Sequence, residues 1–391
     1  MPFELTVPER IVFGRGEIDR VGRWAAEFGR RVLFVRDGGF PEKGGMIEAV
    51  RGRLEAERLA LEEVVVGGEP TVEAVDDLVR QARSFGPEVI LGLGGGSSLD
   101  TAKAAAGLLA NGGEVLDYLE FIGGGRPFQR PAIPLLAVPT TAGTGSEATR
   151  NAVLTSRAHK VKASLRGIAL MPRLALVDPA LTDSLPPAVT ASTGLDALTQ
   201  CLESYLALKA NPFTDALALE GMNRAARSLS RAYHGDAPDA RDDMSLAALF
   251  SGICLANAGL GAIHGLAAAL GGKFPVPHGA ACGLLLPHVF SANAKALAAA
   301  ADGRPTLVKC LRIADIFLPG EGGNDGRRLA RLSDRLFELV AEMKIPGLAS
   351  YGITAADLPA LAAAAKIAGS MKQNPVVLPE ETLIDILRAA L

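Results

Sequence analysis

The side chains best suited to hold a metal ion gather in the second half of the chain. Only five histidines occur in the 391 residues, and three of them lie between positions 264 and 288. His264 falls in an expected helix, and His278 follows the break "GGKFPVPHG", so a helix–break–helix hairpin can bring the two rings together. With Asp196 they would offer one carboxylate and two imidazoles to a divalent cation. The residue types leave open a simpler interpretation, in which each histidine is a hydrogen-bonded core residue.

The stretch "GLDALTQCLE" (194–203) adds a further donor group. Asp196 and Gln200 are four residues apart, so in a helix both side chains leave the same face. This spacing can present two ligands to one ion, although an imidazole would be more usual than the Gln200 amide. The sequence therefore allows a metal site, a former metal site or an ordinary helix surface here.

A glycine-rich turn in the first half indicates a phosphate site. In "GLGGGSSLDTAKAAAG" (92–107) a hydrophobic strand leads into Gly95, Gly96 and Ser97, and a helix is expected to begin near Asp100. Glycines let the backbone approach a phosphate closely, and a helix N-terminus directs N–H groups and positive dipole at it. Ser97 stands where the third glycine of G-x-G-x-x-G would be, so a strand–helix turn without any ligand is the alternative.

Two further strand ends carry polar residues. The segment "AVPTTAGTGSEAT" (137–149) offers the hydroxyls of Thr140, Thr141 and Thr144 after another hydrophobic strand. Loops at the carboxyl ends of parallel strands face one crevice, so the two loops together predict a nucleotide site. Asp37, just past a third strand, is placed to bind an adenosine ribose and would repel a 2′-phosphate, which favours NAD over NADP. An aspartate before two glycines is also a common turn.

Strand–helix alternation positions these loops. Five short runs rich in Val, Leu and Ile read as strands buried on both faces: 31–35, 62–66, 88–94, 133–139 and 174–178. Helical spacing lies between them at 44–58 and 71–86, and later stretches rich in Ala and Leu, such as 243–271, predict helices only. We therefore predict an α/β NAD-binding domain with a parallel sheet over 1–185 and an all-α metal- and substrate-binding domain over 186–391.

The composition limits the classes of partner and the cellular compartment that we expect. The net charge of −3 gives no electrostatic reason to expect nucleic acid or an anionic membrane as a partner. No apolar run is long enough to cross a bilayer, and the N-terminus lacks a signal-peptide core. The cysteines are scattered without a CxxC pair and read as small buried side chains in a reducing compartment, which predicts a cytoplasmic protein: Cys201, Cys254, Cys282 and Cys310.

Several long motifs occur in order along the chain: "GGGSSLDTAK" (94–103), "PTTAGTGSEAT" (139–149), "VDPALTDSLPP" (177–187), "STGLDALTQCLE" (192–203) and "AIHGLAAALGG...PHG...LLPH" (262–288). Together they resemble the iron-containing (group III) alcohol dehydrogenases over nearly the whole chain. The resemblance implies the dehydroquinate synthase-like fold of that family and a homodimer. It implies NAD binding by residues of the first domain: Asp37, Gly95, Gly96, Ser97, Thr140, Thr141, Thr144, Asn151 and Lys162. It also implies metal binding by Asp196, Gln200, His264 and His278.

Two departures from the family pattern bear most on the chemistry. Gln200 stands where the family usually has a histidine, and an amide oxygen is a weaker ligand for Fe²⁺ or Zn²⁺ than imidazole. Ala268 stands where members often carry a second histidine that helps to move the alcohol proton. The proton would then leave through water or the nicotinamide ribose hydroxyl.

These observations predict an NAD(H)-dependent enzyme that interconverts a small alcohol and its aldehyde or ketone, with hydride transfer assisted by a divalent metal, Fe or Zn. Asp196, His264 and His278 are the expected catalytic residues. One alternative is a metal-independent NADH-dependent reductase of the maleylacetate type, although that branch generally keeps a histidine at position 200. A relative that binds NAD without turnover is the alternative from another class.

Overall fold

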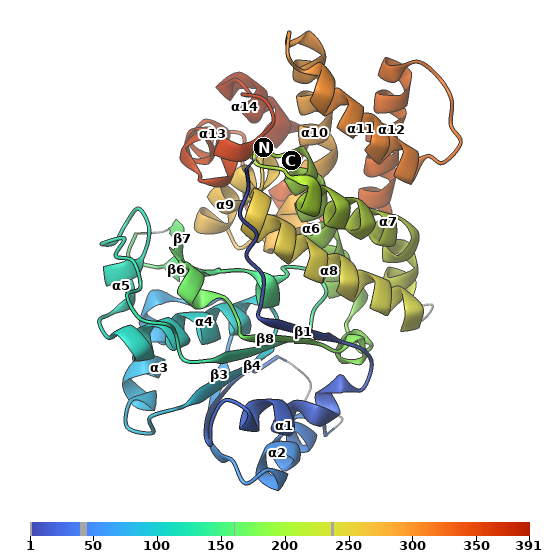
Figure 1. The fold of residues 1–391 in the computed structure, drawn as a ribbon. Coiled ribbons are helices and arrows are strands. Elements are labelled where there is room, and N and C mark those ends of the chain that lie inside the picture. The colour runs from blue at the N-terminus through green and yellow to red at the C-terminus, as the bar shows by residue number, and fades with distance from the viewer. Residues whose placement is uncertain (1, 40–44, 160, 236–237) are drawn as a thin grey trace. The chain divides into compact units, whose positions relative to one another are not determined.

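The computed structural model describes residues 2–39, 45–159, 161–235 and 238–391. The chain forms two compact units (Figure 1). One is the α/β unit, Thr6–Ser184, and the other is the helical unit, which comprises Leu185–Leu391 and the segment up to Leu5. Each unit has its own core and is described by itself.

A parallel sheet forms the centre of the α/β unit, as predicted, and it has six strands where five were expected. Its strand order is β1 (Arg10–Phe13), β8 (Leu174–Val177), β5 (Leu135–Pro139), β4 (Val89–Gly94), β2 (Arg31–Asp37) and β3 (Ala60–Val66). The strand β1 was not predicted, because its four residues lie at an edge of the sheet and are half-buried or exposed. The strands β4, β5 and β8 are buried throughout, which explains their unbroken hydrophobic runs.

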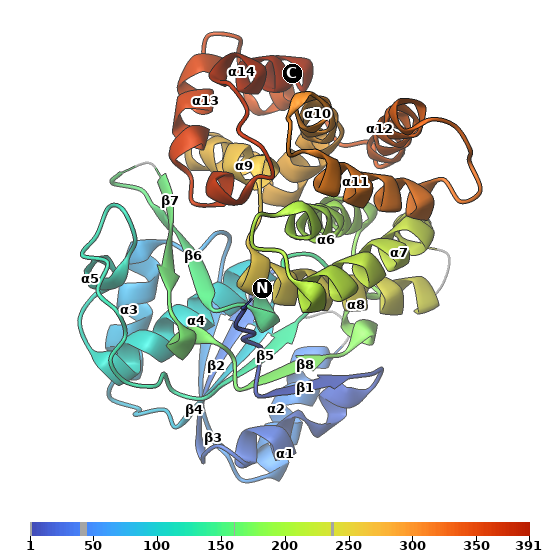
Figure 2. The ribbon, with the colours of Figure 1, turned by 45° about the horizontal axis from the view of Figure 1, so that its top comes forward.

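Helices cover both faces of this sheet (Figure 2). Val32 and Phe34 of β2 pack with α1 (Val21–Ala26) and α2 (Met46–Ala56), whereas alternate residues of the same strand pack with α3 (Val72–Ala82) and α4 (Gly96–Asn111). Side chains of a strand point alternately to opposite faces, so a sheet covered on both sides needs hydrophobic residues at every position. This arrangement holds β2, β4 and β5 side by side, with their carboxyl ends at one edge of the sheet.

An antiparallel hairpin, which the sequence did not reveal, follows the sheet strand β5. It consists of β6 (Asn151–Ser156) and β7 (Val161–Arg166), and β6 packs against α4. Its polar residues alternate with buried Ala and Leu, as in a sheet that is covered on one face only. The hairpin places Asn151 and Lys162 on one small sheet.

The helical unit has α6 at its centre, where it packs against α7, α8 and α10. The helices are α6 (Pro187–Leu206), α7 (Pro212–His234), α8 (Pro238–Ala258), α9 (Ala262–Lys273), α10 (His278–Ala299), α11 (Arg304–Phe317), α12 (Asp325–Glu342), α13 (Leu358–Ile367) and α14 (Glu380–Ala389). The residues from 194 to 206 of α6 are all buried. The motif that begins at Gly194 is therefore not helix surface.

The stretch 243–271, which was predicted to be helical, is divided between two helices. The chain breaks after Ala258, and α8 and α9 meet at an angle of 99°. Gly259 adopts a left-handed φ of 80°, which glycine tolerates at no steric cost. Among the described residues, no single helix is long and apolar enough to cross a membrane, and the bent pair α8–α9 meets that test by length and composition only.

Candidate functional site

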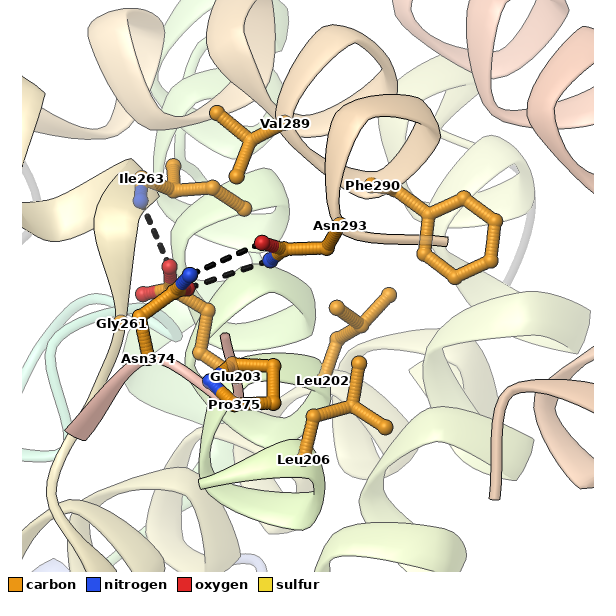
Figure 3. A pocket seen from close by; sticks show the side chains of 10 residues that line it. All are labelled: Leu202, Glu203, Leu206, Gly261, Ile263, Val289, Phe290, Asn293, Asn374 and Pro375. Atoms are coloured by element: carbon orange, nitrogen blue, oxygen red, sulfur yellow. Dashed lines mark hydrogen bonds between the residues drawn. The ribbon is translucent and has the colours of Figure 1, made fainter. Parts of the chain in front are cut away.

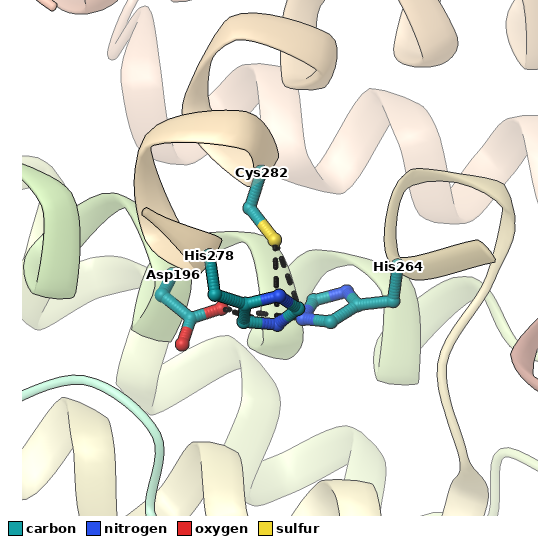
Figure 4. Close-up of side chains that lie close together, drawn as sticks. All are labelled: Asp196, His264, His278 and Cys282. Carbon is teal, nitrogen blue, oxygen red and sulfur yellow. Dashed lines mark hydrogen bonds and ion pairs between the residues drawn. The ribbon is translucent and has the colours of Figure 1, made fainter. Parts of the chain in front are cut away.

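Four potential metal ligands converge inside the helical unit. Figure 4 shows Asp196, His264, His278 and Cys282 with their side chains directed at one another. The ligand atoms of all four lie within 4.8 Å of one another. His264 Nε2 is 3.2 Å from Asp196 Oδ1, and Cys282 Sγ is 3.7 Å from His264 Nε2 and 3.8 Å from His278 Nε2. Within the described residues, no other group of this kind is found.

Three helices deliver these side chains. Asp196 lies in the middle of α6, His264 in the first turn of α9, and His278 is the first residue of α10. Cys282 follows His278 by one helical turn, so both leave the same face of α10. Asp196, His264 and Cys282 are almost completely buried, whereas the His278 side chain remains 38% exposed. His278 is therefore the ligand on the accessible side of the cluster.

Glu203 fixes the orientation of His264. Its Oε2 accepts a hydrogen bond from His264 Nδ1 at 2.6 Å, and its Oε1 accepts one from the backbone N–H of Ile263 at 2.6 Å. A carboxylate on Nδ1 holds the proton there, so Nε2 faces the cluster with its lone pair when the ring is neutral. Glu203 is seven residues, or two turns, beyond Asp196 on α6. Sequence reasoning missed this residue, although the two-turn spacing to Asp196 was visible.

A small pocket beside Glu203 shows how the start of α9 is held (Figure 3). Asn293 and Asn374 exchange side-chain hydrogen bonds of 2.8 and 3.1 Å there. Asn374 Oδ1 also accepts the backbone N–H of Ala262 at 3.1 Å. The first N–H groups of a helix have no partner within the helix. Here side chains from distant elements satisfy them and thereby fix the position of His264.

Gln200 is tied to α8 by its side chain. Its Oε1 accepts a hydrogen bond from Ser251 Oγ at 3.0 Å. Burial raises the pKa of Asp196, but hydrogen bonds from His264 and Gln200 and the neighbouring imidazoles outweigh it and hold this pKa below its usual value. Asp196 is thus kept ionised inside the protein.

The glycine turn of the α/β unit touches the threonine loop directly. The helix α4 begins at Gly96, four residues earlier than the expected start at Asp100. A Cβ on Gly96 would lie 2.8 Å from Thr144 Cγ2, and one on Gly95 would lie 3.5 Å from Thr141 Cγ2. Contacts below 3.0 Å are not tolerated by real Cβ atoms. A side chain at position 96 would therefore displace Thr144, and glycine keeps the start of α4 clear, where a helix N-terminus can bind a phosphate.

The third strand end adjoins the same turn. A Cβ on Gly94 would lie 2.9 Å from the Cβ of Asp37, and the backbone N–H of Thr140 donates to the carbonyl of Gly94 at 3.0 Å. Asp37 Oδ1 accepts the backbone N–H of Gly39 at 2.7 Å, so the residue also forms the turn that was the alternative interpretation. The structure therefore brings the three predicted strand ends together.

Ser97 and Ser98 occupy the first turn of α4. Ser97 is half-buried, and its carbonyl accepts a hydrogen bond from Thr101 Oγ1 at 2.9 Å. The Ser98 hydroxyl is buried and has no hydrogen-bond partner in the structure. Leaving such a group unpaired costs about 1–3 kcal/mol. An orphaned hydroxyl beside a glycine turn fits a site that awaits a ligand.

A buried lysine, which sequence reasoning missed, joins α4 to the second loop. The Lys103 side chain is fully buried, and its Nζ donates to Ser146 Oγ at 2.7 Å, Thr149 Oγ1 at 2.7 Å and the Asn151 carbonyl at 2.9 Å. Asp100 Oδ1 lies 3.4 Å away. Burial lowers the pKa of Lys103. This network sets the path of the chain from the threonine loop into the hairpin.

The remaining two predicted cofactor residues lie on the hairpin. Asn151 begins β6, and its buried side-chain oxygen has no hydrogen-bond partner. Lys162 on β7 forms an ion pair with Glu69, with Nζ and Oε1 2.5 Å apart. Burial raises the pKa of nearby Glu147 to about 7. Asn151 thus offers a free acceptor, whereas the ammonium of Lys162 already has a carboxylate partner.

Comparisons with known proteins agree with this fold and site. A family model described as "Iron-containing alcohol dehydrogenase" matches residues 8–179, and one described as "Fe-containing alcohol dehydrogenase family, C-terminal" matches residues 190–391. Alcohol dehydrogenase 4 of Saccharomyces cerevisiae is 36% identical over 324 residues, which are 82% of this chain and 80% of that protein. The NAD-dependent methanol dehydrogenase of Bacillus methanolicus is 33% identical over 292 residues, which are 73% of this chain and 75% of that protein.

Solved structures agree as well. The crystal structure of a 1,3-propanediol oxidoreductase superposes with a TM-score of 0.92 at 32% identity, covering 100% of both chains. A parallel α/β unit joined to a helical unit of this kind defines the iron-type dehydrogenase fold. The chain belongs to the iron-containing alcohol dehydrogenase family, and it is an enzyme of the alcohol dehydrogenase class. The predicted family and fold are confirmed.

Proposed function

We propose that this enzyme transfers hydride reversibly between NAD(H) and a small alcohol or its aldehyde, with a divalent ion in the cluster of the helical unit. The observation that carries the proposal is the convergence of Asp196, His264 and His278 within the helical unit of a chain of this family. One carboxylate and two imidazoles form a donor set that suits Fe²⁺ or Zn²⁺. An ion there would act as a Lewis acid toward the substrate oxygen.

The chain's own residues prepare this site. Glu203 holds His264 by its Nδ1, which leaves Nε2 directed at the other ligands. Asp196 is kept ionised by the imidazoles around it and supplies negative charge for a cation. Because Ala268 carries no titratable group, we expect the alcohol proton to leave through water or the nicotinamide ribose hydroxyl.

For the cofactor, we infer that NAD(H) binds at the strand ends of the α/β unit. The N-terminus of α4 beside Gly95 and Gly96 would receive the pyrophosphate, and the hydroxyls of the threonine loop would contact it. The Ser98 hydroxyl and the Asn151 oxygen, which lack hydrogen-bond partners in the structure, would supply further polar contacts. Asp37 would accept hydrogen bonds from the adenosine ribose and repel a 2′-phosphate. NADH should therefore bind more tightly than NADPH, as titration by fluorescence can measure.

Steady-state kinetics tests the function. The purified protein, supplied with Fe²⁺ or Zn²⁺, should oxidise primary alcohols with NAD⁺ and reduce aldehydes with NADH. If it does neither over a broad panel, the proposal is wrong. Activity toward an unsaturated oxo-acid that survives exhaustive chelation would instead identify a maleylacetate-type reductase, and tight NADH binding without any turnover would identify a non-catalytic relative. We also infer a homodimer, which light scattering of the purified protein can test.

A further inference from the structure

We propose that the thiolate of Cys282 is the fourth protein ligand of the ion and that Gln200 lies outside the coordination sphere. The inference rests on the proposed metal site and specifies its chemistry. It replaces the family-derived ligand set of Asp196, Gln200, His264 and His278 with one that contains sulfur. The consequence is a centre that prefers Zn²⁺ over Fe²⁺ and that would take the substrate oxygen as a fifth ligand.

The spacing of the four donor atoms is the first argument for Cys282 as a ligand. Around a tetrahedral zinc ion with bonds of 2.0–2.3 Å, donor atoms lie roughly 3.3–3.6 Å from each other. Cys282 Sγ is 3.7 Å from His264 Nε2 and 3.8 Å from His278 Nε2. Asp196 Oδ1 is 3.2 Å from His264 Nε2 and 4.0 Å from His278 Nε2. These four separations differ from that range by at most a few tenths of an ångström, and all the ligand atoms lie within 4.8 Å of one another.

The local geometry of α10 supports the same assignment. Cys282 follows His278 by one turn, and Gly279 between them has no room for a side chain because a Cβ would lie 2.1 Å from the carbonyl oxygen of Ser192 on α6. This close approach of α10 to α6 places Cys282 opposite Asp196. Cys282 is completely buried, so its sulfur faces the other ligands rather than water. The thiol is thus held at the cluster by helix packing.

The hydrogen bond of Gln200 argues against its use as a ligand. Only the carbonyl oxygen of an amide coordinates metal well, and this oxygen accepts a hydrogen bond from Ser251 Oγ at 3.0 Å. Using the oxygen as a ligand would weaken this bond inside a buried region. Gln200 therefore directs its best donor atom at Ser251.

A thiolate changes which ion the site selects. Sulfur is a soft ligand that suits Zn²⁺ better than Fe²⁺, and it adds a second negative charge to the donor set. The two anionic ligands would match the charge of a divalent ion within the coordination sphere.

Cobalt substitution provides the test, because a thiolate bound to Co²⁺ gives an intense near-ultraviolet charge-transfer absorption that oxygen and nitrogen ligands do not give. The full chain, stripped by chelation and titrated with Co²⁺ in the absence of NAD and substrate, should bind one ion and show this band. Cys282→Ser and Cys282→Ala should lose the band. Their affinity for Zn²⁺ should fall by more than the ~10–100-fold that is typical when a residue that hydrogen-bonds to a metal ligand is replaced. X-ray absorption of the zinc form should show one sulfur at about 2.3 Å.

Matched variants separate the outcomes. Cys254→Ala changes another buried cysteine of the same unit, outside the cluster, and should keep the band and the affinity. Gln200→Ala should keep the band. The proposal is overturned if wild-type protein binds Co²⁺ without the band, or if Cys282→Ser keeps it. If the wild-type protein binds no divalent ion at all, the metal-assisted function fails together with this inference, whereas loss of the thiolate signal alone leaves that function intact.

Discussion

Replacing Lys103 with methionine tests the buried network that shapes the predicted cofactor loop. The substitution keeps the length of the side chain but removes three hydrogen bonds, to Ser146, Thr149 and the carbonyl of Asn151. It also removes the charge that faces Asp100 in a buried environment. Removing one partner from a buried charge pair costs about 3–5 kcal/mol. We expect Lys103→Met to lower the free energy of unfolding of the α/β unit by that amount.

The single tryptophan makes the measurement specific. Trp24 packs against the core of the α/β unit, so urea unfolding followed by its fluorescence reports on that unit. Arg80→Met is the matched control, because Arg80 forms an exposed ion pair with Asp77 on α3 and such pairs contribute only about 0–1 kcal/mol. A loss of less than about 1 kcal/mol in Lys103→Met would refute the reasoning. Titration with NADH should show weaker binding by the same variant under conditions where it remains folded.

Four further predictions concern single side chains and the ion. The pKa of Glu147 is about 7 in the folded protein and near 4.5 ordinarily, so between these pH values the folded state holds a proton that the unfolded state has lost. The free energy of unfolding should therefore fall by up to about 3 kcal/mol as the pH rises through this range. Urea titrations at several pH values should show a flatter profile for Glu147→Gln. Gly96→Ala would put a methyl group 2.8 Å from Thr144 Cγ2 and should weaken NADH binding at least about 10-fold by fluorescence titration, with stability changed by only about 1 kcal/mol. Glu203→Gln should lower Zn²⁺ affinity about 10–100-fold in a competition assay, because it weakens the hydrogen bond that orients His264; unchanged affinity would rule out the positioning role. Exhaustive chelation should abolish alcohol oxidation while NADH binding persists, and Zn²⁺ should restore the activity.

The strands that are buried on both faces were the ones that could be predicted from the sequence. Central strands such as β4 and β5 are covered on both faces, so their hydrophobic runs were unambiguous. The edge strand β1 and the hairpin of β6 and β7 mix polar and apolar residues over a few positions, which gives a weak local signal. The break between α8 and α9 lies in a segment of small residues, where the left-handed φ of Gly259 decides the path.

In the candidate site, residues that are recognisable by their type could be predicted, whereas residues whose role depends on distant neighbours could not. The rarity of histidine singled out His264 and His278, and the structure brings both beside Asp196. Cys282 was interpreted as a core residue, since a lone cysteine in an apolar helix carries no local sign of its neighbours. Lys103 could not be recognised either, because its partners are 43–48 residues away and meet it only in the folded chain.

The division of the chain into units has a consequence for how the protein is made. The α/β unit is one continuous stretch, Thr6–Ser184, whereas the helical unit draws on both sides of it, including the residues just before Thr6. During synthesis the α/β unit can complete its core first, since domains generally fold as units as they emerge. The segment up to Leu5, where Phe3 lies 5.7 Å from the ring of Phe213, must wait until α7 has been translated. Shortening the chain before Thr6 should therefore slow the last step of folding and leave the first untouched.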